Sequence, residues 1–186
     1  AFKGGNEFHH FNSKNTDFPG ENIKNIRFLR NDFHFQLNPN TDRTFKPYRI
    51  RRDLNGRFSV DRENADDPAT EADYVYVYFS LRGVSFDPEG HYFVAGNFNN
   101  WQYNRKNRMT YNTDEQVYQK RLLLKQGYYD YKYVYRSNQG RDAYRISGNH
   151  PQTENDYLIY VYYRDYEKGY DRLVGHTLIN SSTIDY

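Results

Sequence analysis

Residues 74–81 have the sequence YVYVYFSL, and residues 128–136 have the sequence YYDYKYVYR. Successive side chains of an extended strand point to opposite faces of a sheet, so a repeat of two places alternate residues on a common face. Aromatic and β-branched side chains fit a pleated, half-buried surface. We therefore expect both segments to be β-strands whose alternate Tyr, Phe and Val side chains are buried in one core.

Other segments with strand character lie on both sides of these two, separated by turn residues. Leu54-Asn55-Gly56 and Lys125-Gln126-Gly127 each predict a hairpin, and Asn-Gly suits the mirror-image turn that joins twisted strands. No window of about 11 residues or more shows the 3.6-residue apolar spacing of a helix. The further expected strands are residues 6–11, 23–29, 32–37, 48–53, 57–60, 91–95, 117–124, 156–163 and 173–179.

The spacing of these segments predicts a chain in three parts. Residues 1–60 carry short strands, and residues 61–73 (DRENADDPATEAD) form an acidic loop or linker without a large apolar residue. Residues 74–186 carry longer strands at regular intervals, which is typical of an immunoglobulin-like sandwich. We therefore predict an all-β fold: an immunoglobulin-like antiparallel β-sandwich over residues 74–186, with residues 1–60 packed on it as an additional N-terminal β-strand region.

The composition argues against several classes of partner and site. The 186 residues carry 26 Lys and Arg against 24 Asp and Glu, and a net charge of +2 offers no broad basic field for nucleic acid. No apolar run approaches the ~20 residues that a membrane-spanning helix needs. Without cysteine, the chain has no thiol nucleophile, thiolate metal site or disulfide. We expect neither a nucleic-acid partner nor a direct membrane span.

The sequence also lacks the usual signs of catalysis. No serine lies in a G-x-S-x-G setting, and there is no glycine-rich phosphate loop. Glu7-Phe8-His9-His10 resembles a metal cluster, but strand alternation sends Glu7 and His9 to one face and His10 to the other. We therefore predict a non-enzymatic protein without catalytic residues, cofactor or metal.

Tyrosine is unusually abundant: 21 Tyr, 13 Phe and one Trp make up 19% of the chain. In residues 157–163 (YLIYVYY), alternation places Leu158, Tyr160 and Tyr162 on the face opposite to the other four residues. One set is expected to be core and the other exposed or covered by the N-terminal strands. Residues 128–135 lead to the same expectation, because they contain more tyrosine than a single core layer is expected to bury; we call this surplus tyrosine. We predict an exposed tyrosine-rich patch, including Tyr160 and Tyr162, that docks a protein partner.

A specific motif begins in residues 92–101 (YFVAGNFNNW), continues with the isolated Met109 and ends in residues 122–133 (LLLKQGYYDYKY). This order resembles the glycogen- and starch-binding modules of the early-set immunoglobulin-like superfamily. The resemblance implies ligand contacts for Trp101 and Lys132, and a carbohydrate-binding module is the alternative function. Asn99, which we expect to hold the turn before Trp101, is a further candidate contact with a ligand or partner. Those modules hold sugar between two tryptophans, whereas the loop at residues 137–142 (SNQGRD) supplies no second one. Trp101 as a packed sandwich residue is the competing interpretation.

A wider resemblance rests on residues 2–8 (FKGGNEF), 74–81, 124–129 (LKQGYY), 154–157 (ENDY), 161–164 (VYYR), 171–175 (DRLVG) and 179–181 (INS). Together these segments resemble the type IX secretion system plug protein family of Bacteroidetes, long known only as a domain of unknown function. The resemblance implies a non-enzymatic periplasmic protein of the cell envelope that occludes an outer-membrane translocon, with a translocon component as its partner. Because the chain begins with Ala1 and shows no signal sequence, we expect that any targeting segment has been lost from it.

Overall fold

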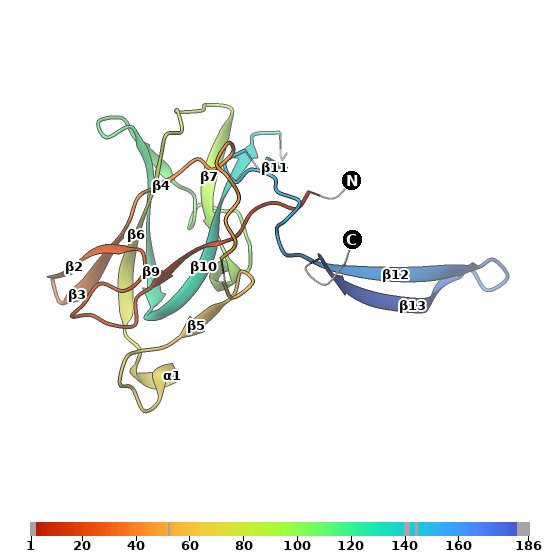
Figure 1. Ribbon diagram of the computed structural model, residues 1–186, viewed down its shortest axis with the longest axis horizontal. Helices are drawn as coiled ribbons and strands as arrows, with labels where there is room; N and C mark the ends of the chain where they lie inside the picture. The colour runs from red at the N-terminus through yellow and green to blue at the C-terminus, as the bar shows by residue number, and fades with distance from the viewer. Residues whose placement is uncertain (1–2, 52, 140–141, 144, 182–186) are drawn as a thin grey trace.

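The computed structural model describes residues 3–51, 53–139, 142–143 and 145–181, and the regular secondary structure of this part of the chain is almost entirely β-strand (Figure 1). The all-β class expected from the alternating segments is therefore confirmed. A one-turn helix, α1 (Pro68–Glu71), and a 3₁₀ turn, η1 (Asn97–Asn99), interrupt the strands. The strands are β1 (His9–Asn12), β2 (Ile23–Leu29), β3 (Asp32–Leu37), β4 (Asn40–Thr41), β5 (Phe58–Val60), β6 (Tyr74–Arg82), β7 (Gly90–Ala95), β8 (Thr110–Asn112), β9 (Val117–Lys125), β10 (Gly127–Ser137), β11 (Asp142–Ala143), β12 (Asp156–Asp165) and β13 (Tyr170–Asn180).

Two sheets form a β-sandwich. The first has the order β2-β3-β6-β9-β8, with β4 also paired to β6, and the second is built around β10, which pairs with β1, β5, β7 and β11. The strands of residues 1–60 thus contribute to both sheets. The pairs β3–β6 and β4–β6 are parallel, which departs from the expected antiparallel arrangement. Long crossovers through β5 and α1 separate these pairs in the chain and permit the parallel direction.

Much of the core between the sheets comes from the two segments on which the fold prediction rests. Val75, Val77, Phe79 and Leu81 of β6 are at most 1% exposed, and the prediction of alternate burial is confirmed. The expectation of surplus tyrosine in β10 is wrong, because Tyr129, Tyr131, Tyr133 and Tyr135 are all buried. Each of their hydroxyls reaches a polar partner, such as the carbonyl of Lys125 for Tyr129 and the side chain of Asn40 for Tyr131. A packed core can accommodate several tyrosine side chains when each hydroxyl has a hydrogen-bond partner.

Neither of the two hairpins predicted from turn residues forms. The turn at Leu54–Arg57 does close, with Asn55 and Gly56 at positive φ, but residues 48–51 and 53 are in no strand, and β5 pairs with β10. Between β9 and β10 the chain crosses from one sheet to the other instead of turning back. The buried amide of Gln126 fixes this crossing: it donates to the carbonyls of Ser13 and Lys14 and accepts from the main-chain N–H of Asp73.

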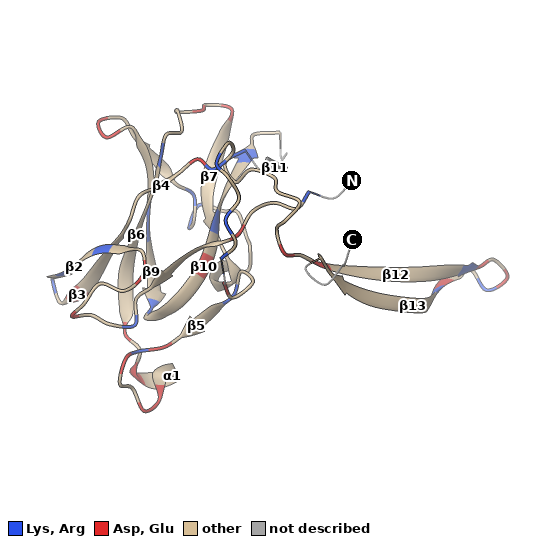
Figure 2. Ribbon diagram, viewed as in Figure 1, with Lys and Arg blue, Asp and Glu red and all other residues tan. Residues whose placement is uncertain are grey.

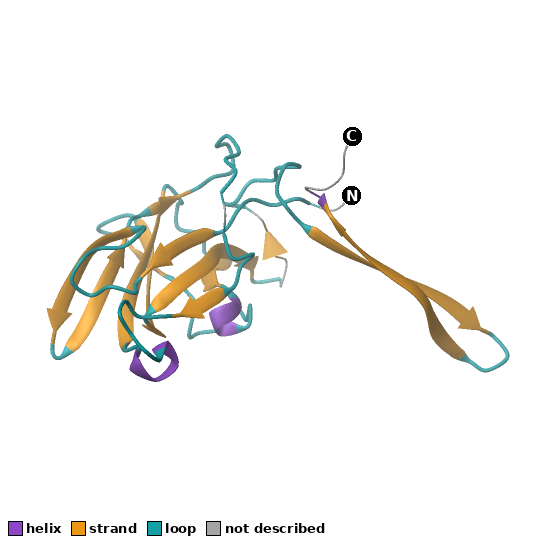
Figure 3. Cartoon of the chain, turned by 60° about the horizontal axis from the view of Figure 1, so that its bottom comes forward, coloured by secondary structure: helices purple, strands orange, loops and turns teal. Residues whose placement is uncertain are grey.

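The last two strands lie outside the sandwich. β12 and β13 pair with each other alone among the described strands, and they project from the sandwich as a long hairpin (Figure 3). The expectation that they belong to the sandwich is therefore wrong. Alternation divides side chains between two faces, but it does not tell whether either face is covered. Hydrogen bonds attach the base of the hairpin to the N-terminal segment. The side chains of Thr153 and Asn155, at the base, donate to the main-chain carbonyls of Gly5 and Gly4 respectively.

Candidate functional site

The hairpin formed by β12 and β13 is apolar and exposed on both faces. Roughly half of the exposed large apolar side chains in the described chain belong to it or to its tip. Residues 157–163 and 173–179 contain no Lys, Arg, Asp or Glu, and the charges gather at the tip and the base (Figure 2). At the tip, Arg164 and Asp171 form an ion pair across the strands at 3.0 Å. The long arms of the hairpin therefore present neutral, apolar surface.

The register of the hairpin places the predicted contact residues on one face. Leu158 lies opposite Leu178, Tyr160 opposite His176, and Tyr162 opposite Leu173. The side chains of Tyr160 and Tyr162 are 51% and 60% exposed, and their ring centroids lie 6.3 Å apart. A bulge follows Val161, where Val174 is the extra residue on β13.

The opposite face is exposed as well, which corrects the expectation that one set would be core. Ile159, Val161 and Tyr163 are 43%, 52% and 60% exposed. The expectation failed because the N-terminal strands join the two sheets of the sandwich and leave both faces of the hairpin bare. An isolated two-stranded hairpin is only marginally stable in water. Large bare apolar surfaces of this kind mark interaction sites.

A further row of tyrosines lies on the outer face of the first sheet. Tyr74, Tyr76 and Tyr78 of β6 point away from the core, and Tyr74 is 61% exposed. Neighbouring polar side chains partly cover this row: the Arg121 guanidinium lies 4.8 Å from the centroid of Tyr76, and His34 hydrogen-bonds the Tyr78 hydroxyl at 2.8 Å. This row was missed from the sequence, although the alternation that predicts the buried Val and Phe of β6 also implies it.

Trp101 and Lys132, which the glycan-binding resemblance singles out, meet around Phe8. The Trp101 ring is 36% exposed and lies 5.7 Å from the Phe8 ring, at an interplanar angle of 55°. Lys132 belongs to β10, and its ammonium lies 4.0 Å from the centroid of the Phe8 ring. Burial lowers the pKa of Lys132 to about 8, and the positive charge of Arg43 adds to this effect. Phe8 thus stands beside Trp101 as a tilted neighbour, without forming a second parallel wall.

Asn99 has a structural role at this place. Its Oδ1 accepts from the main-chain N–H of Gly96, and its Nδ2 donates to the carbonyl of Val94. These bonds hold the 3₁₀ turn that precedes Trp101, so the amide is engaged within the protein. Gly140 and Arg141, in the loop where the resemblance would place a second sugar-stacking ring, lie outside the described residues.

The residues of the Glu-Phe-His-His segment have separate partners. The Glu7 carboxylate accepts from the Tyr48 hydroxyl, the His9 ring stacks on Tyr131, and His10 stacks on Tyr128. Among the residues that the structure describes, no group of three or more His, Asp and Glu side chains is arranged to hold a metal ion. In the same part of the chain, no helix has the length and apolarity to span a membrane.

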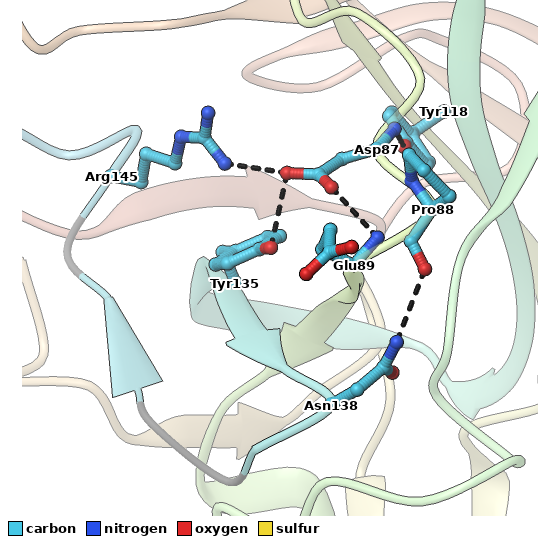
Figure 4. Close-up of polar contacts among 7 residues, drawn as sticks. All are labelled: Asp87, Pro88, Glu89, Tyr118, Tyr135, Asn138 and Arg145. Carbon is cyan, nitrogen blue, oxygen red and sulfur yellow. Dashed lines mark hydrogen bonds and ion pairs between the residues drawn. The ribbon is translucent and has the colours of Figure 1, made fainter.

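A polar network at one end of the sandwich was not predicted (Figure 4). The Asp87 carboxylate accepts from the Tyr135 hydroxyl at 3.0 Å, from Arg145 at 2.6 Å and from the main-chain N–H of Glu89 at 2.9 Å. The Glu89 N–H and the Arg145 guanidinium hold the pKa of Asp87 below its usual value. Two of these partners come from other segments of the chain, so Asp87 fastens its own loop to β10 and to the segment that carries Arg145.

Comparisons with known proteins bear on the fold. No protein-family model matches the chain, and no curated protein matches it. A solved structure that resembles it is the crystal structure of a hypothetical protein from Parabacteroides merdae ATCC 43184 at 2.30 Å resolution, with 34% sequence identity and a TM-score of 0.84. The match covers 95% of this chain, so it omits roughly nine residues and includes most of the hairpin, but it covers only 45% of that chain. The chain therefore shares its fold with a protein more than twice as long.

Proposed function

We propose that the chain is a non-enzymatic interaction protein of the cell envelope that resembles the type IX secretion plug. In this proposal, hairpin β12–β13 docks a protein component of an outer-membrane translocon from the periplasmic side. The sequence segments that resemble the plug family support a location in the periplasm, and four of these segments lie in the hairpin or at its base.

The observation that carries the docking role is the double exposure of the hairpin. Leu158, Tyr160 and Tyr162 on one face and Ile159 and Val161 on the other are all at least 43% exposed. Tyrosine gives large contact area at low cost in conformational entropy, which favours it at protein interfaces. Both strands also keep one edge without a strand partner among the described residues, so a partner strand can extend the sheet.

Photo-cross-linking in native envelope tests the proposal. A photoreactive phenylalanine analogue replaces Tyr160 in the full-length protein, and the cross-linked products are identified by mass spectrometry. The matched control carries the analogue at Tyr74, which is similarly exposed but lies on the sandwich. We expect an outer-membrane protein to be cross-linked from Tyr160 and not from Tyr74. Cross-links to lipid alone, or equal products from both positions, would contradict the proposal.

A second candidate function is α-glucan binding at Trp101, favoured by the partial exposure of this ring beside Lys132 and Phe8. Trp101 is the single tryptophan of the chain, so its fluorescence reports this site alone. Saturable quenching by soluble α-glucan would support glycan binding. Unchanged fluorescence, together with cross-linking from Tyr160, would leave docking as the function.

A further inference from the structure

A second surface of the protein forms a pocket of about 540 Å³ beneath the segment that follows β4. Its floor comes from residues 6–9, and its rim comes from residues 39–51. This pocket lies on the sandwich and plays no part in the proposed docking by the hairpin. We call it the cationic pocket, and its charged lining residues are Glu7, Arg43, Lys46, Arg49 and Arg51.

The charges of the cationic pocket are unbalanced. Four cationic side chains face one carboxylate, and the Glu7 carboxylate already accepts a hydrogen bond from the Tyr48 hydroxyl. The Arg43 guanidinium donates to the main-chain carbonyl of Glu7 at 2.7 Å, and no carboxylate among the described residues forms an ion pair with it. Uncompensated positive charge in a concave site attracts anions.

One donor in the cationic pocket is buried without a partner. The Nε atom of Arg43 is inaccessible to solvent and has no hydrogen-bond acceptor among the described residues. Leaving a buried donor unpaired is costly, more so when the group is charged. The Arg43 guanidinium thus keeps hydrogen-bonding capacity that no described protein group uses.

The positive charges around the pocket also affect the pKa of His9, which lines it. Its pKa lies well below the usual value, chiefly because the ring is buried and next because of the charge of Arg43, with His10, Lys132 and Arg51 adding to the effect. Burial also lowers the pKa of Arg43 itself. Several cations are thus held together against their mutual repulsion, which an anion would relieve.

We propose that the cationic pocket binds a small organic phosphate monoester. Guanidinium groups match the geometry of phosphate oxygens, and a dianion suits a site where four cations face one acid. The volume exceeds that of a phosphate group and leaves room for a body the size of a sugar, within the usual range of ligand pockets.

Titration calorimetry of the full chain with α-D-glucose 1-phosphate, inorganic phosphate and uncharged glucose tests this proposal. We expect both phosphates to bind and glucose not to bind. The test variant carries Arg49→Gln and Arg51→Gln, two exposed positions at the rim, and should lose affinity roughly tenfold or more. The control variant carries Arg27→Gln and Arg105→Gln, two exposed positions that do not line this pocket, and loses the same net charge.

Equal loss of affinity in both variants would reduce the effect to general electrostatics and overturn the proposal, as would absence of phosphate binding to the unmodified chain. A second measurement needs no variant. The side-chain Nε–H resonance of Arg43 should shift in the nitrogen–proton spectrum when α-D-glucose 1-phosphate is added. Binding that leaves this resonance unmoved would place the ligand elsewhere. None of these outcomes depends on the hairpin, so failure here would leave the proposed function standing.

Discussion

Single residues around Trp101 show how tightly the loops pack on the sandwich. Gly56 has a φ of +75°, and a Cβ built on it would lie 2.7 Å from the Phe8 ring and 2.8 Å from the Trp101 ring. The positive φ of Gly56 explains why the Asn-Gly turn needs glycine. The two contacts show that the same glycine also makes room for both rings, which the sequence pattern could not reveal.

Gly56→Ala should therefore destabilise the protein by about 2–4 kcal/mol, because strain at positive φ adds to the clash with two rings. Gly83→Ala is the matched control, since Gly83 has a φ of +71° and nothing within 4 Å of an added Cβ. It should lose only about 1 kcal/mol from backbone strain. Denaturant unfolding measures both values, and equal losses would show that the rings do not restrict the site.

Asp130 makes the stability of the fold depend on pH. Its side chain is fully buried, Oδ1 has no hydrogen-bond partner among the described residues, and Oδ2 accepts from the main-chain N–H groups of Leu54 and Gly56. Burial raises the pKa of Asp130 to about 6, and the hydrogen bond from Leu54 partly opposes the shift. The folded state thus binds the proton more tightly than the unfolded state. Its contribution to stability is present below the unfolded pKa of ~4 and is lost as pH rises through 6.

The free energy of unfolding should therefore fall by an amount on the order of 2 kcal/mol through this group between pH 4 and pH 7. Asp130→Asn should abolish that part of the fall, because the amide carries no charge to desolvate. Asp114→Asn, at an exposed turn, is the control and should leave the profile unchanged. The measurement is urea unfolding at a series of pH values. An unaltered profile for Asp130→Asn would assign the pH dependence to other groups.

At the level of elements, strands β10 and β12 have similar alternating sequences but lie in opposite environments. β10 is the centre of a sheet with its tyrosines buried, whereas β12 has exposed side chains along most of its length. Tyr131→Ala should cost about 3–5 kcal/mol of stability, because it removes a large side chain from a packed core. Tyr160→Ala should change stability by less than about 0.5 kcal/mol. Chemical unfolding followed by circular dichroism measures both, and a large loss for Tyr160→Ala would mean that the hairpin is part of the core.

The limits of prediction follow the same division. The expected bounds of β2 and β3 agree with the structure, and those of β6, β9 and β10 are one or two residues short, because period-two patterns report local backbone geometry directly. Strand pairing depends on distant segments. The crossing at Gln126, the parallel pair β3–β6 and the separation of β12–β13 from the sandwich had no local signal. The same holds for the candidate site: the exposure of Tyr160 and Tyr162 was expected, but the bare second face and the cationic pocket arise from tertiary arrangement.

At the scale of the whole molecule, a closed sandwich carries an open hairpin. The sandwich buries the inner faces of its two sheets against each other, whereas the hairpin is attached at its base through Thr153 and Asn155 to the N-terminal segment (Figure 1). Most of this hairpin is included in the match to the longer Parabacteroides merdae protein. In the function that we propose, the sandwich is the support and the hairpin is the element that binds the partner.

Amide hydrogen exchange of the full chain, alone and in the cross-linked or co-purified envelope complex, tests this claim most directly. In the isolated chain, the amides of β12 and β13 should exchange quickly, because an unsupported hairpin opens at little cost, while those of β6 and β10 should exchange slowly. In the complex, the amides of β12 and β13 should become protected and those of β6 and β10 should keep their slow rates. Hairpin amides that are already as protected as β10 in the isolated chain, or that gain no protection in the complex, would contradict the account.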